Sequence, residues 1–222
     1  MAVKTKVYWA YYTPNNFSRV AGFPPERLIS SLKNEPLWRD TRHGDILKCP
    51  STLKTLKNTY LIRSSLNAIY EVQDTAIVSD YAGIIGHVED YLQLHHVISY
   101  YFFSEKPVTL NLTPPYYHPE CMAGVSGSFD ISKWLRPVGP TISMQIQKAV
   151  TLKYGQPVMY VDFDCPVELV QFYPTEELRQ IADLSASLKT NLKNTPLTSL
   201  YDMFTRNKLN KKVIREIKNN LL

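Results

Sequence analysis

Apolar and polar residues alternate in short runs along most of the chain before residue 174, and β-branched and aromatic residues dominate these runs. Successive side chains of a strand point to opposite faces of a sheet, so the alternation predicts strands with one buried face. Residues that favour turns separate the runs, as at Gly155-Gln156-Pro157. The predicted strands cover residues 6–12, 45–50, 59–65, 68–78, 91–103, 107–112, 141–147, 149–155, 157–164 and 167–173.

After Pro174 the apolar residues change to the spacing of a helix. Thr175 is the predicted N-cap, and two glutamates follow it in the first turn, where carboxylates suit the positive end of the helix dipole. Two more helices are predicted, one over residues 196–204 and one from about residue 210. Earlier in the chain only residues 25–34 predict a helix, which a pair of prolines begins.

Together these elements predict an α+β fold: mainly an antiparallel β sandwich or a distorted jelly-roll-like barrel, with C-terminal helices. We expect a β-rich domain at residues 1–174 with one N-terminal helix, and a helical C-terminal appendage at residues 175–222 packed on it. The sequence has neither an internal repeat nor a low-complexity linker.

The composition, 44% hydrophobic and 20% charged residues, is ordinary for a soluble globular protein. Its 15 tyrosines favour sheets and contact surfaces, because a tyrosine ring packs while its hydroxyl stays in water. No run approaches the roughly 18 apolar residues of a membrane span, and the first residues do not predict a signal peptide. The three cysteines, Cys49, Cys121 and Cys165, are too far apart for a cysteine zinc site and favour a reducing compartment.

The net charge of +5 is concentrated in the last eighteen residues, which carry six basic residues and a single acidic one. The residues before them are balanced. An apolar stripe and the lysines occupy different faces of the predicted last helix, so three interpretations stay open: a docked surface helix, a partner-binding helix and a nucleic-acid contact. Its basic residues are Lys208, Lys211, Lys212, Arg215 and Lys218.

The segment GSFDISKWLRP, residues 127–137, holds the densest group of charged and aromatic side chains. Asp130 is expected to cap a short turn, with Trp134 pointing into the core. Lys133 and Arg136 are expected to pair with Asp130 or to lie over the indole ring. One interpretation is a self-satisfied plug that locks the sheet; the other places the two basic side chains at a site for an anionic ligand or a partner.

Two His-x-Glu pairs are the metal-site candidates, His87 with Glu89 and His118 with Glu120. Positions i and i+2 of a strand share a face, so each pair can present an imidazole and a carboxylate together to a divalent metal. The pairs match no cupin signature, and loop histidines are more often solvated or bonded to backbone, so no cofactor is expected.

The sequence lacks the motifs of several enzyme classes. It has no G-x-S-x-G nucleophile elbow, no G-x-x-x-x-G-K phosphate loop and no G-x-G-x-x-G dinucleotide motif. We therefore lean against an enzyme.

Four stretches resemble a family of tailed-bacteriophage proteins, including marine cyanophage-type ones, to which no activity is assigned. They are LKCPSTLKTLKNTYLIRSS, YYFFSEKPVTLNLTPPYYH, GSFDISKWLRP and LKYGQPVMYVDFDCPVELVQF. The chain differs from the family at residues 65–67, where Ser-Leu-Asn replaces a Pro-Asp pair. The resemblance implies a phage protein made in the host bacterial cytoplasm.

These features predict a non-catalytic phage protein that acts through protein–protein contacts, as a virion or assembly component or a host-interaction factor. Its expected partners are other phage proteins, a host protein or further copies of itself, and not a membrane. Two alternatives stay open. One is a jelly-roll metal-dependent enzyme or binder of a small anionic ligand, and the other is a nucleic-acid contact through the basic C-terminal helix.

Overall fold

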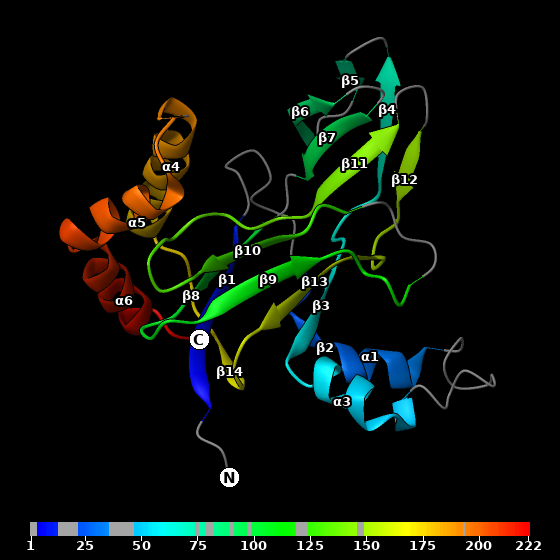
Figure 1. The fold of residues 1–222 in the computed structure, drawn as a ribbon, viewed down its shortest axis with the longest axis horizontal. Helices are drawn as coiled ribbons and strands as arrows, with labels where there is room; N and C mark the ends of the chain where they lie inside the picture. Colours follow the sequence, from blue (N-terminus) through cyan, green and yellow to red (C-terminus); the bar gives the residue numbers. More distant parts are fainter. Residues whose placement is uncertain are drawn as a thin grey trace.

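The computed structural model describes residues 4–12, 22–35, 47–73, 76–78, 82–88, 91–96, 99–118, 124–145, 149–192 and 194–222 (Figure 1). The strands are β1 (Thr5–Tyr12), β2 (Glu26–Arg27), β3 (Thr59–Arg63), β4 (Ala68–Gln73), β5 (Ala76–Val78), β6 (Ala82–Val88), β7 (Tyr91–His96), β8 (Ser99–Phe103), β9 (Thr109–Thr113), β10 (Gly127–Asp130), β11 (Thr141–Gln145), β12 (Val150–Leu152), β13 (Pro157–Phe163) and β14 (Val167–Gln171). The helices are α1 (Leu28–Asn34), α3 (Pro50–Leu56), α4 (Glu176–Asn191), α5 (Leu197–Arg206) and α6 (Leu209–Asn219).

The described strands form four hydrogen-bonded groups, in the orders β14-β1-β8, β10-β9-β13-β3-β2, β11-β7-β6 and β12-β4-β5. All pairs are antiparallel except β1 with β14, which run parallel in the register Thr5 to Val167. The mixed α+β fold with mostly antiparallel strands is therefore confirmed. None of these described groups closes into a barrel. Of the two predicted folds, the structure therefore agrees with the open, layered sandwich and not with the jelly-roll-like barrel.

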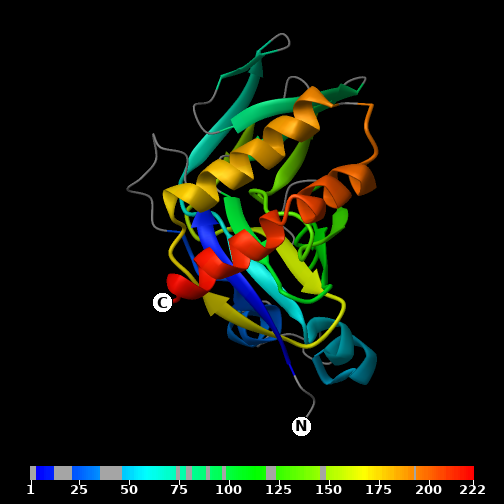
Figure 2. The same cartoon turned by 90° about the vertical axis from the view of Figure 1, so that its left-hand side faces the viewer.

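The sheet β14-β1-β8 is the middle of three layers, because its two faces lie in different cores. Val7 and Trp9 of β1 pack with the five-stranded sheet, in a cluster that also holds Tyr60 and Leu110. The alternate residues, including Tyr8, pack instead with the C-terminal helices. Figure 2 shows α4, α5 and α6 lying across the sheet that contains β1. Successive side chains of β1 point to opposite faces of the sheet, and both faces are buried. This explains why the sequence of β1 is almost unbroken in its apolar character.

The N-terminal part contains two described helices where the sequence predicted one. Helices α1 and α3 cover the far face of the five-stranded sheet, through Leu28, Leu56 and Tyr160. The strand predicted at residues 45–50 is wrong: among its described residues, 47 and 48 form a 3₁₀ turn and Pro50 begins α3. Proline at the first helical position is favoured because its fixed φ suits a helix and its missing N–H is not needed there.

The C-terminal helices begin within about a residue of the predicted starts. Thr175 is the N-cap of α4, and its hydroxyl accepts a hydrogen bond from Leu178 N at 3.3 Å. Helix α6 starts at Leu209, directly after Lys208, whose φ of 58° lies in the left-handed region. That conformation turns the chain sharply between α5 and α6.

Candidate functional site

The segment 127–137 folds as a strand followed by a turn that its own side chains stabilise. Residues 127–130 form β10, which pairs with β9. The Asp130 carboxylate then accepts hydrogen bonds from Ser132 N at 2.9 Å and Ser132 Oγ at 2.7 Å, and lies 3.4 Å from Lys133 Nζ. The predicted Asp130 turn and its ion pair are therefore both present.

Trp134 connects this turn to the helical layer. Its side chain is 1% exposed, and its ring packs on two residues of α5, with centroid distances of 5.5 Å to Tyr201 and 5.8 Å to Phe204. Phe129, from the same segment, is buried in the core on the other side of the middle sheet. The segment thus contributes an aromatic anchor to each of the two main cores.

Arg136 lies over the ring of Phe129, with its guanidinium carbon 4.4 Å from the centroid, and not over the indole ring or beside Asp130 as predicted. Burial lowers the pKa of this guanidinium, and nearby Tyr201 raises it by a smaller amount. Its buried Nε atom has no hydrogen-bond partner among the described residues. Lys133 is exposed but paired with Asp130, so the segment acts mainly as a plug within its own fold.

The two predicted metal pairs are only partly described. His87 belongs to β6 and His118 to the loop after β9, while Glu89 and Glu120 lie outside the described residues. No group of three or more His, Cys, Asp or Glu side chains suited to a metal occurs among the side chains that are described. The pairing of each histidine with its glutamate stays a prediction.

His118 belongs to a polar network that the sequence did not reveal. Its Nδ1 atom lies 2.6 Å from Tyr160 Oη, which also accepts a hydrogen bond from Tyr117 N at 3.2 Å. Either atom of this pair can donate, according to the tautomer of the ring, and the other ring nitrogen, Nε2, lies 3.9 Å from Glu35 Oε1. Burial lowers the pKa of His118, Glu35 raises it and Arg63 lowers it.

Arg63 extends this network to the N-terminal helix. Its guanidinium donates to Ser31 Oγ at 2.7 Å and to Gly155 O at 3.0 Å, and it pairs with Glu26 at 3.3 Å. Glu35 lies 3.7 Å from the same group. The network joins α1, β3 and the loop before β13, so we assign it a structural role.

The basic C-terminal helix α6 is docked on the body, as the first of its three interpretations predicted. Val213 and Ile217 are fully buried against the helical core. Lys212 pairs with Glu177 of α4, and Lys218 Nζ lies 2.9 Å from Glu105 Oε1 in the turn between β8 and β9. The remaining basic residues of the predicted set are exposed: Lys208, Lys211 and Arg215.

Two hollows adjoin the β8–β9 turn, one between this turn and the beginning of β1 and the other between the turn and α6. Their volumes are about 210 Å³ and 230 Å³, and both are lined by Ser104 and Glu105. The first is also lined by Lys4, Lys6 and Lys106, and the second by Lys211. The sequence did not predict this group, because its lysines come from three distant parts of the chain.

Cys49 stands at the N-cap position of α3, with its sulfur 2.9 Å from Ser51 Oγ. Hydrogen bonds from the side chain of Ser51 and from Thr52 stabilise the thiolate and lower the pKa of this thiol to about 7. Its reactivity is therefore expected to exceed that of an ordinary surface cysteine near neutral pH.

Large apolar side chains are exposed in several places, including Ile69 and Tyr154 beside β4 and β12, and Tyr173 and Leu222 beside β14. Among the helices that the structure describes, none combines the length and apolar composition needed to cross a membrane. In comparisons with known proteins, no family model, no curated protein and no solved structure matches the chain.

Proposed function

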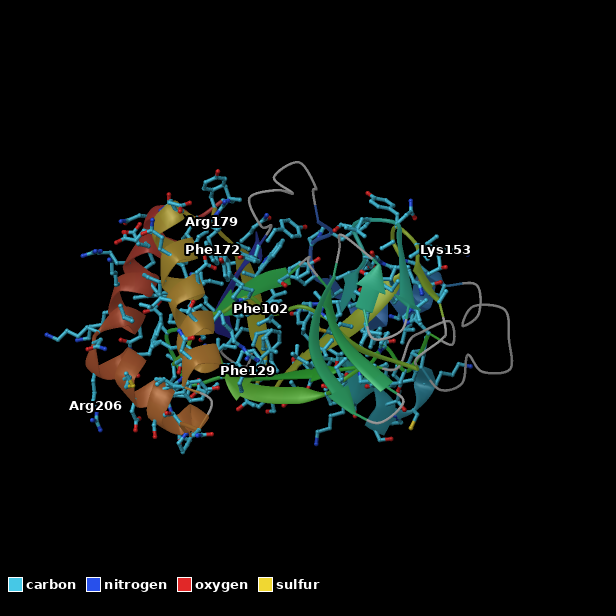
Figure 3. All side chains as sticks on the ribbon, turned by 90° about the horizontal axis from the view of Figure 1, so that it is seen from above. Phe102, Phe129, Lys153, Phe172, Arg179 and Arg206 are labelled. Atoms are coloured by element: carbon cyan, nitrogen blue, oxygen red, sulfur yellow. The ribbon has the colours of Figure 1, made fainter. Side chains whose placement is uncertain are left out.

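We propose that this chain is a non-catalytic phage protein that acts through contacts with other proteins, as a virion or assembly component or as a host-interaction factor. The observation that carries the proposal is that two groups of exposed apolar side chains lie on separate parts of the fold, one beside β4 and β12 and the other beside β14. Lys153 and Phe172, which directly precede the tyrosines of the two groups, lie well apart in Figure 3. A protein with two separate apolar surfaces can join two neighbours in an assembly.

The first group contains Tyr154, which is 61% exposed, and Ile69, which is 57% exposed. Tyr154 is held in place: its backbone N–H donates to Asn67 Oδ1 at 2.8 Å, and its ring packs on Phe23 with a centroid distance of 4.9 Å. A fixed aromatic side chain loses little conformational entropy on binding, which favours its use in contacts.

The second group contains Tyr173, 59% exposed, and Leu222, 74% exposed. A short antiparallel ladder fixes both, with hydrogen bonds from Tyr173 N to Asn220 O at 2.9 Å and from Leu222 N to Gln171 O at 3.1 Å. In this register the two apolar side chains fall on one face of the ladder. Backbone pairing thus holds them exposed, where burial against a partner would stabilise a complex.

The proposal is tested by mass spectrometry of purified particles of the phage that encodes the chain, with its copy number measured against the major capsid protein. A virion role predicts a constant copy number, which Ile69→Ser with Tyr154→Ser lowers. The matched control is Leu184→Ser, which removes a similarly exposed apolar side chain from α4. A host-interaction role predicts absence from particles and a stable complex with one host protein. A monomer that joins neither the particle nor any phage or host protein would show that the proposal is wrong.

A further inference from the structure

The two hollows at the β8–β9 turn share Ser104 and Glu105, and we call the surface around them the lysine groove, defined by Lys4, Lys6, Lys106 and Lys211. All four lysines are exposed. None of them takes part in an ion pair with another described residue. Three of these lysines line the first hollow and one lines the adjoining second hollow, an arrangement that attracts an anion.

Glu105 lines both hollows but does not neutralise the groove. Its carboxylate already accepts hydrogen bonds from Lys218 Nζ at 2.9 Å and from Tyr8 Oη at 3.1 Å. The hydrogen bond from Lys218 is the main cause that lowers the pKa of Glu105, so this side chain remains a charged, paired carboxylate at neutral pH. Asp130, near the second hollow, is engaged in the same way by Lys133.

Two further carboxylates lie nearby. Glu168 of β14 is the register partner of Lys6, but no ion pair joins them among the described contacts. Asp164 lies close by as well, in the turn whose Pro166 carbonyl accepts a hydrogen bond from Thr5 N, and it has no ion pair among the described contacts. The four lysines of the groove outnumber these two carboxylates. The excess positive charge faces the hollows and is available to a ligand.

We propose that the lysine groove binds the phosphate backbone of duplex nucleic acid, independently of its base sequence. Lysines contact backbone phosphates as point charges, and each of the two adjoining hollows presents at least one lysine to such a backbone. Thr5 and Asn210, which also line the hollows, contribute a hydroxyl and a side-chain amide as neutral donors. No exposed aromatic side chain lines either hollow in the described chain. Stacking of splayed bases, the usual mode for single strands, is therefore not supported.

This inference goes beyond the proposed protein contacts and uses a different surface. Figure 1 shows why the sequence hides it: β1, β8 and α6 come together at one corner of the fold, although the chain brings in β1 first and α6 last. The basic tail alone is a weak indication of nucleic-acid binding. In the folded chain, three lysines from outside the tail, Lys4, Lys6 and Lys106, lie next to it.

The inference is tested by fluorescence anisotropy of a labelled duplex of arbitrary sequence, titrated with the full chain at several salt concentrations. The variant Lys4→Gln/Lys6→Gln/Lys106→Gln is expected to weaken binding at least about tenfold and to reduce the salt slope by about 2 to 3, since each phosphate contact contributes about 0.9. The matched control is Lys54→Gln/Lys57→Gln/Lys153→Gln, which removes the same charge from exposed lysines elsewhere and is expected to change binding less than twofold.

A second variant is expected to increase the affinity for duplex, an effect that a misfolded protein would not produce. Glu105→Gln removes the one carboxylate that lines both hollows and releases Lys218, so it is expected to tighten duplex binding a few-fold. Equal losses in the two triple variants would overturn the inference, and so would no effect of Glu105→Gln. Tighter binding of single strands than of duplex would also overturn it. Saturable binding of tripolyphosphate without any duplex binding would point to a small phosphorylated ligand and reject nucleic acid. All these outcomes leave the copy number of the protein in phage particles unaffected, so the two proposals fail separately.

Discussion

Replacement of Trp134 by alanine is the most direct test of the structural role of residues 127–137. A buried tryptophan removes about 150–250 Å² from water, which at about 25 cal/mol per Å² corresponds to about 4–6 kcal/mol as an upper limit. Core truncations of this size cost about 3–5 kcal/mol in practice. The free energy of unfolding of Trp134→Ala is therefore expected to fall by about 3–5 kcal/mol.

One property of the site moves the expected loss for Trp134→Ala toward the lower end of this range. The indole Nε1 of Trp134 is buried without a hydrogen-bond partner among the described residues, and such a group costs about 1–3 kcal/mol. Alanine removes this cost together with the ring. Phenylalanine also removes the N–H but keeps most of the packing against α5, so Trp134→Phe is expected to lose no more than about 1 kcal/mol.

The assay is urea unfolding followed by far-UV circular dichroism, because fluorescence would change with the indole itself. A double-mutant cycle with Phe204→Ala is expected to give a coupling energy of about 0.5–1.5 kcal/mol, since the two rings are in contact. If Trp134→Ala lost less than about 1 kcal/mol, or Trp134→Phe lost as much as Trp134→Ala, the segment would not anchor the helices to the sheet.

Three further predictions follow from single residues. The rate of Cys49 alkylation is expected to rise with a midpoint near pH 7, and the fast phase is expected to vanish in Cys49→Ser when modification is followed by mass spectrometry. Lys208→Gly is expected to raise the free energy of unfolding by up to about 1 kcal/mol, because glycine adopts the left-handed backbone without strain; a decrease would contradict this. The pKa of His118 is lower in the folded chain than its ordinary value of 6.5, so below that pH the unfolded chain binds more protons than the folded chain. The free energy of unfolding is therefore expected to keep its full value above pH 6.5 and to fall as the pH is lowered toward the folded-state pKa. Urea unfolding down to about pH 5, where carboxylates begin to titrate, should show a flatter dependence for His118→Asn.

Strands and helices with a strong local pattern were predictable from the sequence. Strand β13 and helix α4, for example, lie where alternation and an N-cap placed them. The pattern failed at residues 47–50, where a short apolar run before a proline is ambiguous between a strand and the approach to a helix. It also missed β6, whose glycines weaken the alternation, although β6 pairs with β7 over most of its length.

The turn at Asp130 was predictable because its contacts lie within a few residues. The position of Arg136 over Phe129 was not predictable. The ring of Phe129 and the indole of Trp134 are both near Arg136 in sequence, and only the path of the turn decides which ring the guanidinium contacts. The His118 network and the lysine groove were hidden for a more general reason. Their members come from elements far apart in the chain, and only the packing of those elements brings them together.

The parallel pairing of β1 with β14 has a consequence for how the chain folds. β1 is the central strand of its sheet, yet its partners in β14 lie about 160 residues later. Pairing across such a separation carries a large loop-closure cost, so we expect refolding to be slow and to end with this step. During synthesis, the edge of β1 that pairs with β14 stays unpaired until the last third of the chain has been made. Fragments that stop before residue 167 should therefore aggregate, and chaperones that shield unpaired strands should raise the yield of the intact chain.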